Sequence, residues 1–324
     1  MRDSDYIYAV ACIRVKEKTL LTDADIQTMI GMNDEEAVLR YLVERGWGEG
    51  GSAEPDMETV LSQEQEKQMK LLTTLGVEKK VIDVLFIEEL YHNIKTAIKQ
   101  VCSGTEDEAA FYDSEELSGK ELRRIMRERD FDSLPENLKK TAHDGMELML
   151  SSRDGQRLDV FVDRACLDAI EKAAATTKDR FLAEYAENKV AVADMKIAVR
   201  AADTKKSYAF CEEALAPNRT IDVKALALAA SNGRESVLEY LEKTSMRAAA
   251  EALRESFSAF EKWCDNYIMS TLMNQKTNIE SSGPIVAFYL AKQNEIRTAR
   301  IIMTAKANGF SEEDIQKRVR RMYG

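Results

Sequence analysis

Between Gly155 and Pro217 the sequence reads QRLDVFVDRACLDAIEKAAATTKDRFLAEYAENKVAVADMKIAVRAADTKKSYAFCEEALA, 61 residues that contain neither glycine nor proline. A second stretch of 49 residues without either lies between Gly233 and Gly283. Strands average about five or six residues and are joined by turns that favour glycine and proline, whereas good helix formers dominate both stretches. The sequence therefore predicts an all-α fold.

Apolar residues in the predicted helices recur at intervals of three and four positions. In residues 86–101 they are Phe86, Leu90, Ile94, Ala97, Ile98 and Val101. This spacing places them on one face of a helix, the face that packs against a core. Near the C-terminus we expect Ser311 to cap a helix that begins with acidic residues and ends with basic ones, as the helix dipole favours.

Composition argues against several classes of protein. The 324 residues carry a net charge of −11, with 46 basic and 57 acidic side chains, whereas nucleic-acid binders normally carry a basic surface. The five cysteines form no CxxC pair, so a disulfide framework or a zinc ribbon is not expected. No apolar run approaches the about 18 residues of a membrane span, and the charged N-terminus does not resemble a signal peptide. We expect a cytoplasmic protein with free thiols and no nucleic-acid partner.

Internal repetition is the strongest signal in the sequence. The segment NDEEAVLRYL (residues 33–42) recurs as NGRESVLEYL (residues 232–241), with six of ten positions identical, and a weaker copy begins at Ser133. Each of the first two begins with asparagine and has glutamate three residues later, the pattern of a capping box. We therefore expect helices capped by Asn33 and Asn232.

A second landmark, an apolar residue followed by a basic residue, any residue and alanine, repeats with the same period. Its copies are IKTA (94–97), MKIA (195–198) and IRTA (296–299), spaced 101 residues apart. Two landmarks with one period predict three similar helical modules of about 100 residues.

We place the modules at residues 1–105, 106–208 and 209–324. A pseudo-threefold arrangement around a central axis is favoured over an open row, because the period is much longer than the 33 to 47 residues of common helical solenoids. The sequence leaves both arrangements open.

The basic residue of the second landmark has no acidic residue three or four positions before it in any copy. Lys95 and Lys196 are followed four positions later by Lys99 and Arg200, so a basic ridge repeats in an acidic protein. We interpret this ridge as a contact surface for an acidic partner. The alternatives are pairing with an acid on an adjacent helix, or simple solvation.

Candidate catalytic groups are few. Glu89 and His92 have the Glu-x-x-His spacing that di-iron helix bundles use twice, but Lys140 stands where the second glutamate would precede His143. Phosphate-binding loops and nucleophiles with a placed base are not recognised either. We expect no catalytic, cofactor-binding or metal site and no small-molecule substrate.

Motifs at both ends resemble those of the C subunit of rotary V/A-type ATPases, whose eukaryotic counterpart is called d. YIYAVACIR (6–14), followed by Leu20 and Leu21, resembles the family's N-terminal signature, and ELYHNIK (89–95) its first inner-helix motif. GPIVAFYLA (283–291), continuing through EIR (295–297) to KANG (306–309), is similar to its C-terminal signature. The chain length suits bacterial and archaeal members.

The resemblance implies three similar all-helical domains arranged as a funnel, and a non-catalytic role. Such a subunit is peripheral to the membrane: it caps the membrane-embedded proteolipid (c) ring on its cytoplasmic side and receives the tip of the central shaft, made of the D and F subunits. It thereby transmits torque between ATP hydrolysis or synthesis and the transport of H⁺ or Na⁺.

On this reading the basic ridge faces the shaft. We expect the shaft-binding residues to be Lys95, Lys99, Lys196, Arg200, Arg297 and Arg300, with Asn294 and Glu295 orienting them. The alternative is a soluble all-helical scaffold, unrelated to an ATPase, that binds an acidic protein partner through the same ridge.

Overall fold

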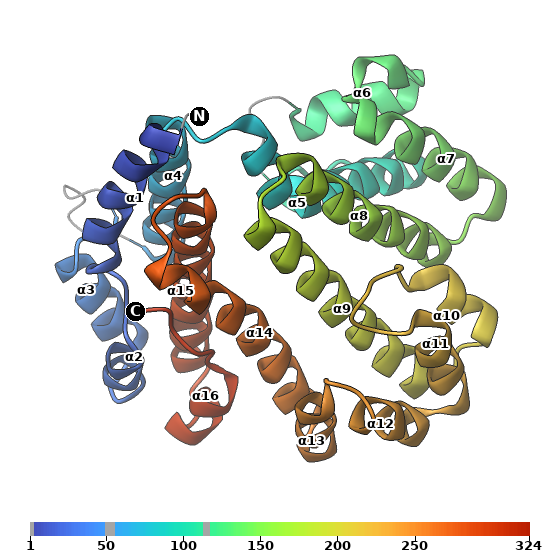
Figure 1. Cartoon of the computed structure of the whole chain (residues 1–324). Helices are drawn as coiled ribbons and strands as arrows, with labels where there is room; N and C mark the ends of the chain where they lie inside the picture. The colour runs from blue at the N-terminus through green and yellow to red at the C-terminus, as the bar shows by residue number, and fades with distance from the viewer. Residues whose placement is uncertain (1–2, 49–55, 113–116) are drawn as a thin grey trace. The chain divides into compact units, whose positions relative to one another are not determined.

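The computed structural model describes residues 3–48, 56–112 and 117–324, with side chains from residue 6 onward. All regular elements in these ranges are helices (Figure 1), so the prediction of an all-α fold is confirmed. None of the helices in the described ranges is both long and apolar enough to span a membrane. The α-helices are α1 (Asp3–Glu17), α2 (Asp23–Ile30), α3 (Glu35–Glu44), α4 (Met57–Thr74), α5 (Lys79–Ser103), α6 (Gly119–Glu128), α7 (Glu136–Ser152), α8 (Gly155–Thr177), α9 (Arg180–Asp203), α10 (Tyr208–Ala214), α11 (Val223–Asn232), α12 (Arg234–Glu242), α13 (Arg247–Glu255), α14 (Phe257–Met273), α15 (Gly283–Ala307) and α16 (Glu312–Arg318), with short 3₁₀ turns η1 (Glu108–Ala110), η2 (Phe131–Ser133) and η3 (Asn274–Thr277).

The chain divides into two compact units. Unit 1 contains both ends of the sequence, namely Met1–Val81, Asp179–Tyr185 and Leu241–Gly324. Unit 2 contains Ile82–Lys178 and Ala186–Tyr240. This division does not follow the boundaries expected after residues 105 and 208, and the three modules stay a prediction.

Unit 1 is built around α15, which contacts α1, α3, α4, α14 and α16. Sixteen of the 25 residues of α15 are buried, whereas Arg297, Arg300 and Thr304 in its second half are exposed. The helix is therefore internal over its first half and has an exposed face over its second. Its fully buried Ala299 and Ile302 belong to one core cluster with Leu21, Val38 and Leu61. Because Pro284 lies in the first turn, where its missing N–H is not needed, the apolar run can start a helix there.

Unit 2 packs α7 closely on its neighbours. A Cβ added at Gly145 of α7 would lie 3.1 Å from Cδ1 of Ile98 on α5 and 3.3 Å from Cδ1 of Leu158 on α8. The predicted apolar stripe of α5 is confirmed at Ile94, Ala97 and Ile98, each at most 1% exposed, whereas Phe86 and Leu90 are only half-buried. The buried face of α5 therefore contains part of the predicted stripe.

Three helices are longer than the rest of those described: α5 and α15 with 25 residues and α9 with 24. Each carries one copy of the second landmark. Lys95 and Lys196 both follow the first residue of their helix by 16 positions, and Arg297 follows the first residue of α15 by 14. The sequence repeat thus falls at nearly the same depth in three long helices.

The helix starts correct the predicted caps. Asp34, not Asn33, caps α3 by accepting a 2.8 Å hydrogen bond from the backbone N–H of Ala37. Asn232 is the last residue of α11, and Gly233, with φ of 110°, separates it from α12. Aspartate caps as well as asparagine, so the pattern located the helix but not its first residue. The Ser311 cap is confirmed, since its Oγ accepts from the N–H of Asp314 at 3.2 Å.

Candidate functional site

Lys95 and Lys99 of the predicted ridge pair with α8. Nζ of Lys95 lies 2.6 Å from Oδ1 of Asp163 and 3.7 Å from Oδ1 of Asp159, and Nζ of Lys99 lies 2.6 Å from the same Asp159 oxygen. The alternative stated above, pairing with an acid on an adjacent helix, describes both lysines. The side chain of Asp163 is 55% exposed, so this pair lies at the surface.

The corresponding residues of α9 also lie in unit 2. Lys196 is half-buried and Arg200 is exposed, and both have interaction partners within the protein. An ion pair of 2.6 Å between Lys189 on α9 and Glu88 on α5 connects the two long helices of this unit. Unit 2 thus contains four of the eight predicted site residues.

The other four lie on α15 in unit 1. Arg297 is exposed, and among the described residues its guanidinium makes no ion pair or hydrogen bond. Arg300 pairs with Glu58 of α4, and Asn294 donates a 3.0 Å hydrogen bond to the carbonyl of Arg321. Glu295 is only 1% exposed, so its side chain contributes to the interior of unit 1.

Glu295 belongs to a buried ionic cluster that the sequence analysis did not identify. Nζ of Lys292 lies 3.0 Å from Oε2 of Glu295 and 3.5 Å from Oε2 of Glu64 on α4. Oε1 of Glu64 in turn pairs with Nζ of Lys67 at 2.6 Å. Lys292 also stands 4.5 Å from the ring centre of Trp47, a cation–π contact. The one sequence signal was a Lys–Glu pair three residues apart, directly after the mostly apolar run of residues 283–291.

Burial raises the pKa of Glu295 to about 7, while Lys292 and the hydrogen bond from the Leu21 N–H act in the opposite direction. The ionised carboxylate loses its hydration in this interior, and the nearby ammonium group recovers only part of that loss. The cluster thus holds a carboxyl group whose charge changes near neutral pH.

Asp194 on α9 is a second buried carboxyl group. It is fully buried and accepts hydrogen bonds from the N–H of Ala216 at 2.9 Å and from Nδ2 of Asn218 at 2.8 Å. Burial raises its pKa to about 7, against the effect of the Ala216 hydrogen bond and of the Arg164 charge. Asp194 therefore holds the segment between α10 and α11 against α9.

His92, the histidine of the Glu-x-x-His pattern, packs against the segment that follows α5. Nε2 of His92 lies 3.0 Å from the carbonyl oxygen of Ala110, and its ring meets that of Tyr112 edge-on at 4.9 Å. Nε2 of His92 is thus hydrogen-bonded to the backbone. Within the described part of the chain, no three histidine, cysteine or acidic side chains are grouped as metal ligands would be.

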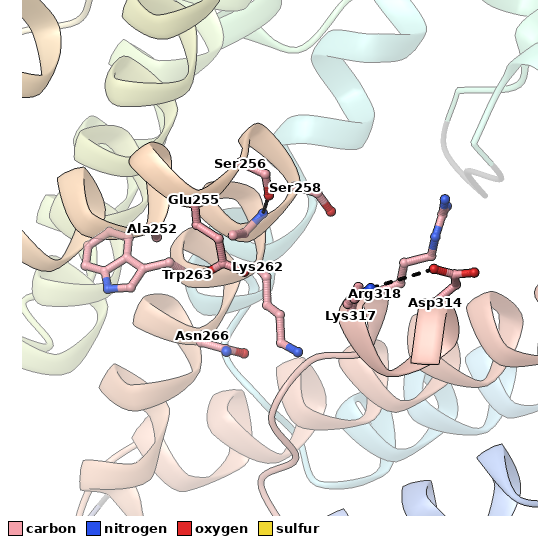
Figure 2. Close-up of a pocket in the computed structure, with 11 residues that line it drawn as sticks. Ala252, Glu255, Ser256, Ser258, Lys262, Trp263, Asn266, Asp314, Lys317 and Arg318 are labelled. Carbon is pink, nitrogen blue, oxygen red and sulfur yellow. Dashed lines mark hydrogen bonds and ion pairs between the residues drawn. The ribbon is translucent and has the colours of Figure 1, made fainter. Parts of the chain in front are cut away.

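A pocket of about 480 Å³ lies in unit 1 between α14 and α16, with the end of α13 at its edge (Figure 2). Lys262 projects into it from α14 and donates a 3.1 Å hydrogen bond to the carbonyl of Gln316. Burial and the nearby Arg320 lower the pKa of Lys262. The charged lining residues are Glu255, Lys262, Asp314, Lys317 and Arg318. The pocket lining therefore carries charges of both signs, of which Lys317 and Asp314 lie 3.9 Å apart.

The chain is similar to known proteins over nearly its whole length. The family model described as ATP synthase (C/AC39) subunit matches residues 9–318, which include all of α5, α9 and α15. The chain is 21% identical over 272 residues to the C subunit of the V-type sodium ATPase of Enterococcus hirae, covering 83% of each protein. It is 23% identical over 345 residues to the C subunit of the A-type ATP synthase of Methanocaldococcus jannaschii, covering 96% of this chain and 85% of that protein.

Proposed function

Because the chain belongs to the ATP synthase (C/AC39) subunit family, we propose that it is the non-catalytic coupling subunit of a V/A-type rotary ATPase. In this role it caps the membrane proteolipid ring on the cytoplasmic side and receives the central shaft of D and F subunits. It then passes torque between ATP hydrolysis or synthesis and the transport of H⁺ or Na⁺. The observation that carries the proposal is the family match over residues 9–318.

The architecture is suited to transmitting torque. A helix of 25 residues is about 37 Å long, and α15 contacts five other helices through its sixteen buried residues. Stiff, well-packed helices transfer force without requiring an active site. This supports a mechanical role for the long helices of the family fold.

The basic ridge is our candidate for the shaft contact. A surface ion pair such as Lys95–Asp163 contributes only about 0–1 kcal/mol, so an acidic side chain of a partner can replace Asp163 at little cost. Arg297 is exposed on α15 and is available for such a contact. In the proposed role the protein joins a shaft to a ring of many proteolipid copies, whose symmetries differ. Polar contacts that can exchange partners suit such a junction.

The complex itself provides the first test. A tagged chain is purified from gently solubilised native membranes and the assembly is weighed by intact mass spectrometry. We expect the proteolipid and the two shaft subunits to be recovered with it. Recovery as a bare monomer, from membranes that still contain an intact ATPase, would contradict the proposal and favour the independent scaffold.

Charge reversal tests the ridge separately. We expect a triple variant, Lys95→Glu, Lys196→Glu and Arg297→Glu, to bind an isolated D–F shaft more weakly and with an altered salt dependence. The matched control reverses three exposed lysines elsewhere, Lys70, Lys224 and Lys243, for the same change in net charge. Equal shaft affinity of the two folded variants would remove the ridge from the interface without affecting the assignment to the complex.

A further inference from the structure

Each of the three long helices has a buried polar residue immediately before the apolar residue of the second landmark. These residues are Asn93 on α5, Asp194 on α9 and Glu295 on α15, spaced 101 residues apart. They are 2%, 0% and 1% exposed. A buried polar side chain requires a hydrogen-bonding partner, so its repetition at one position indicates a shared partner type.

In all three cases the partner is the backbone N–H of a loop. Tyr112 donates to Oδ1 of Asn93 at 2.9 Å, and Ala216 donates to Oδ1 of Asp194 at 2.9 Å. Leu21 donates to Oε1 of Glu295 at 2.6 Å. The loops precede α6, α11 and α2 respectively. The same contact therefore fastens one loop to each long helix, and we call each such contact a loop clasp.

We propose that Asn93, Asp194 and Glu295 are equivalent positioning residues, and that proton binding tightens the clasps of Asp194 and Glu295 but not that of Asn93. This inference goes beyond the proposed coupling role and does not depend on it. It rests on the repeated geometry and on the chemical difference between an amide and a carboxyl group at one position.

The Asn93 clasp has no protonation equilibrium of its own, because a carboxamide does not titrate; the titratable group in contact with this loop is His92, whose ring meets that of Tyr112 at 4.9 Å. The Nδ2 of Asn93 also donates a 2.9 Å hydrogen bond to the carbonyl of Tyr112. The Asn93 side chain thus binds both the backbone N–H and the backbone carbonyl of Tyr112. A carboxylate cannot reproduce the second bond, because it has no hydrogen to donate. The two carboxyl clasps are therefore more sensitive to charge than the amide clasp.

Around Glu295 the charged groups are Lys292 on its own helix and Glu64 and Lys67 on α4, while the α1–α2 loop contributes the N–H of Leu21. Around Asp194 they are Arg164 and Glu171 of α8, and the α10–α11 segment contributes the Ala216 N–H and the Asn218 amide. Burial outweighs the neighbouring cations at both sites and raises each pKa to about 7.

The direction of the effect follows from linkage. Opening a loop hydrates its carboxyl group, whose pKa then returns toward the ordinary value of about 4. The closed state binds the proton more tightly than the open state, so lowering the pH through 7 favours closure and raising it favours opening. Between pH 6 and pH 8 this predicts an increase of about tenfold in the opening equilibrium.

Amide hydrogen exchange on the full chain measures the three clasps side by side. With rates corrected for the intrinsic pH dependence of exchange, we expect the opening equilibria of Leu21 and Ala216 to increase about tenfold from pH 6 to pH 8. Tyr112, held by Asn93, should not change when the measurement is made in a His92→Gln chain, which removes the imidazole in contact with it. The same pH dependence at all three amides would overturn the proposal.

Three variants replace a carboxyl group by a carboxamide, or the reverse, at these positions. Glu295→Gln should abolish the pH dependence at Leu21 and leave it at Ala216, and Asp194→Asn should do the reverse. Asn93→Asp should introduce a pH dependence at Tyr112. A purely structural role would change protection by the same factor at every pH. If one variant does not fold, the comparison of Leu21 and Ala216 with Tyr112 still decides the outcome.

Discussion

Replacing Lys292 with methionine tests whether the buried ionic cluster of Glu64, Lys67, Lys292 and Glu295 stabilises unit 1. Methionine has nearly the length of lysine but no charge, so packing is largely kept. The side chain of Lys292 is 6% exposed and lies within 3.5 Å of both glutamates. After the change Glu64 still pairs with Lys67, whereas Glu295 keeps only the N–H of Leu21.

The expected loss is large because one partner of a buried pair is removed while the other remains. Such changes cost about 3–5 kcal/mol, against a total stability of about 5–15 kcal/mol for a typical domain. The loss should shrink as the pH falls, since protonated Glu295 needs no counter-ion. Because its pKa is already about 7 beside Lys292, and removing a cation raises it further, the full loss should appear only well above pH 7.

Urea unfolding followed by tryptophan fluorescence is a suitable assay, because both tryptophans, Trp47 and Trp263, belong to unit 1. The control Lys317→Met removes an exposed lysine paired with Glu313, and we expect little change. A double variant, Lys292→Met with Glu295→Gln, should recover most of the stability. A loss below about 1 kcal/mol at pH 8.5, or a loss that the double variant does not reduce, would refute the reasoning about the desolvated charge.

Three further predictions concern single contacts. In Gly283→Ala the added Cβ would overlap Oε1 of Gln275 and lie 2.9 Å from its Cδ, so we expect a loss of about 1–3 kcal/mol by urea unfolding. In Glu187→Ala the N–H groups of Arg219 and Thr220 lose an acceptor at 2.7 Å, so trypsin should cleave faster after Arg219. Burial raises the pKa of Glu187, but the hydrogen bonds from Thr220 and Arg219 lower it by more, so the net pKa is lowered. The protection against cleavage should therefore be present at neutral pH and be lost as the pH falls through that pKa. In Ser311→Ala the loss of the cap should cost about 1 kcal/mol and speed amide exchange at Asp314.

Local periodicity was sufficient to predict the all-α class and part of the buried face of α5. Ile94, Ala97 and Ile98 are buried as their spacing predicts, and Ser311 caps α16. These features depend on residues three or four positions apart, which a helix brings together without help from the rest of the chain. The cap expected at Asn33 was wrong by one residue, because two neighbouring residues were both able to cap.

The charge pairing could not be predicted in this way. No acid precedes Lys95 by three or four residues, yet Asp163, 68 residues later, lies 2.6 Å away. The partners Glu64 and Lys292 are separated by more than 200 residues of sequence. Which acid meets which base depends on how α8 packs on α5 and α4 on α15, and no local rule contains that information. An unbalanced charge in the sequence is therefore a weak predictor of an unbalanced charge on the surface.

Hydrogen bonds between distant parts of the sequence also join the N-terminal and C-terminal segments of unit 1. Leu21 donates to Glu295, the N–H of Met322 donates to Oδ1 of Asp23 at 3.0 Å, and the hydroxyl of Tyr323 lies 3.3 Å from Oε1 of Glu17. Residues 17–23 thus lack these partners until residues 295–323 have been synthesised. Unit 2 uses only residues 82–178 and 186–240, and during synthesis its partners become available earlier. We therefore expect the Leu21–Glu295 clasp to close among the last steps of folding. It joins residues 274 positions apart, so the entropy cost of closing its loop is larger than for the Asp194 and Asn93 clasps, which join residues 22 and 19 positions apart.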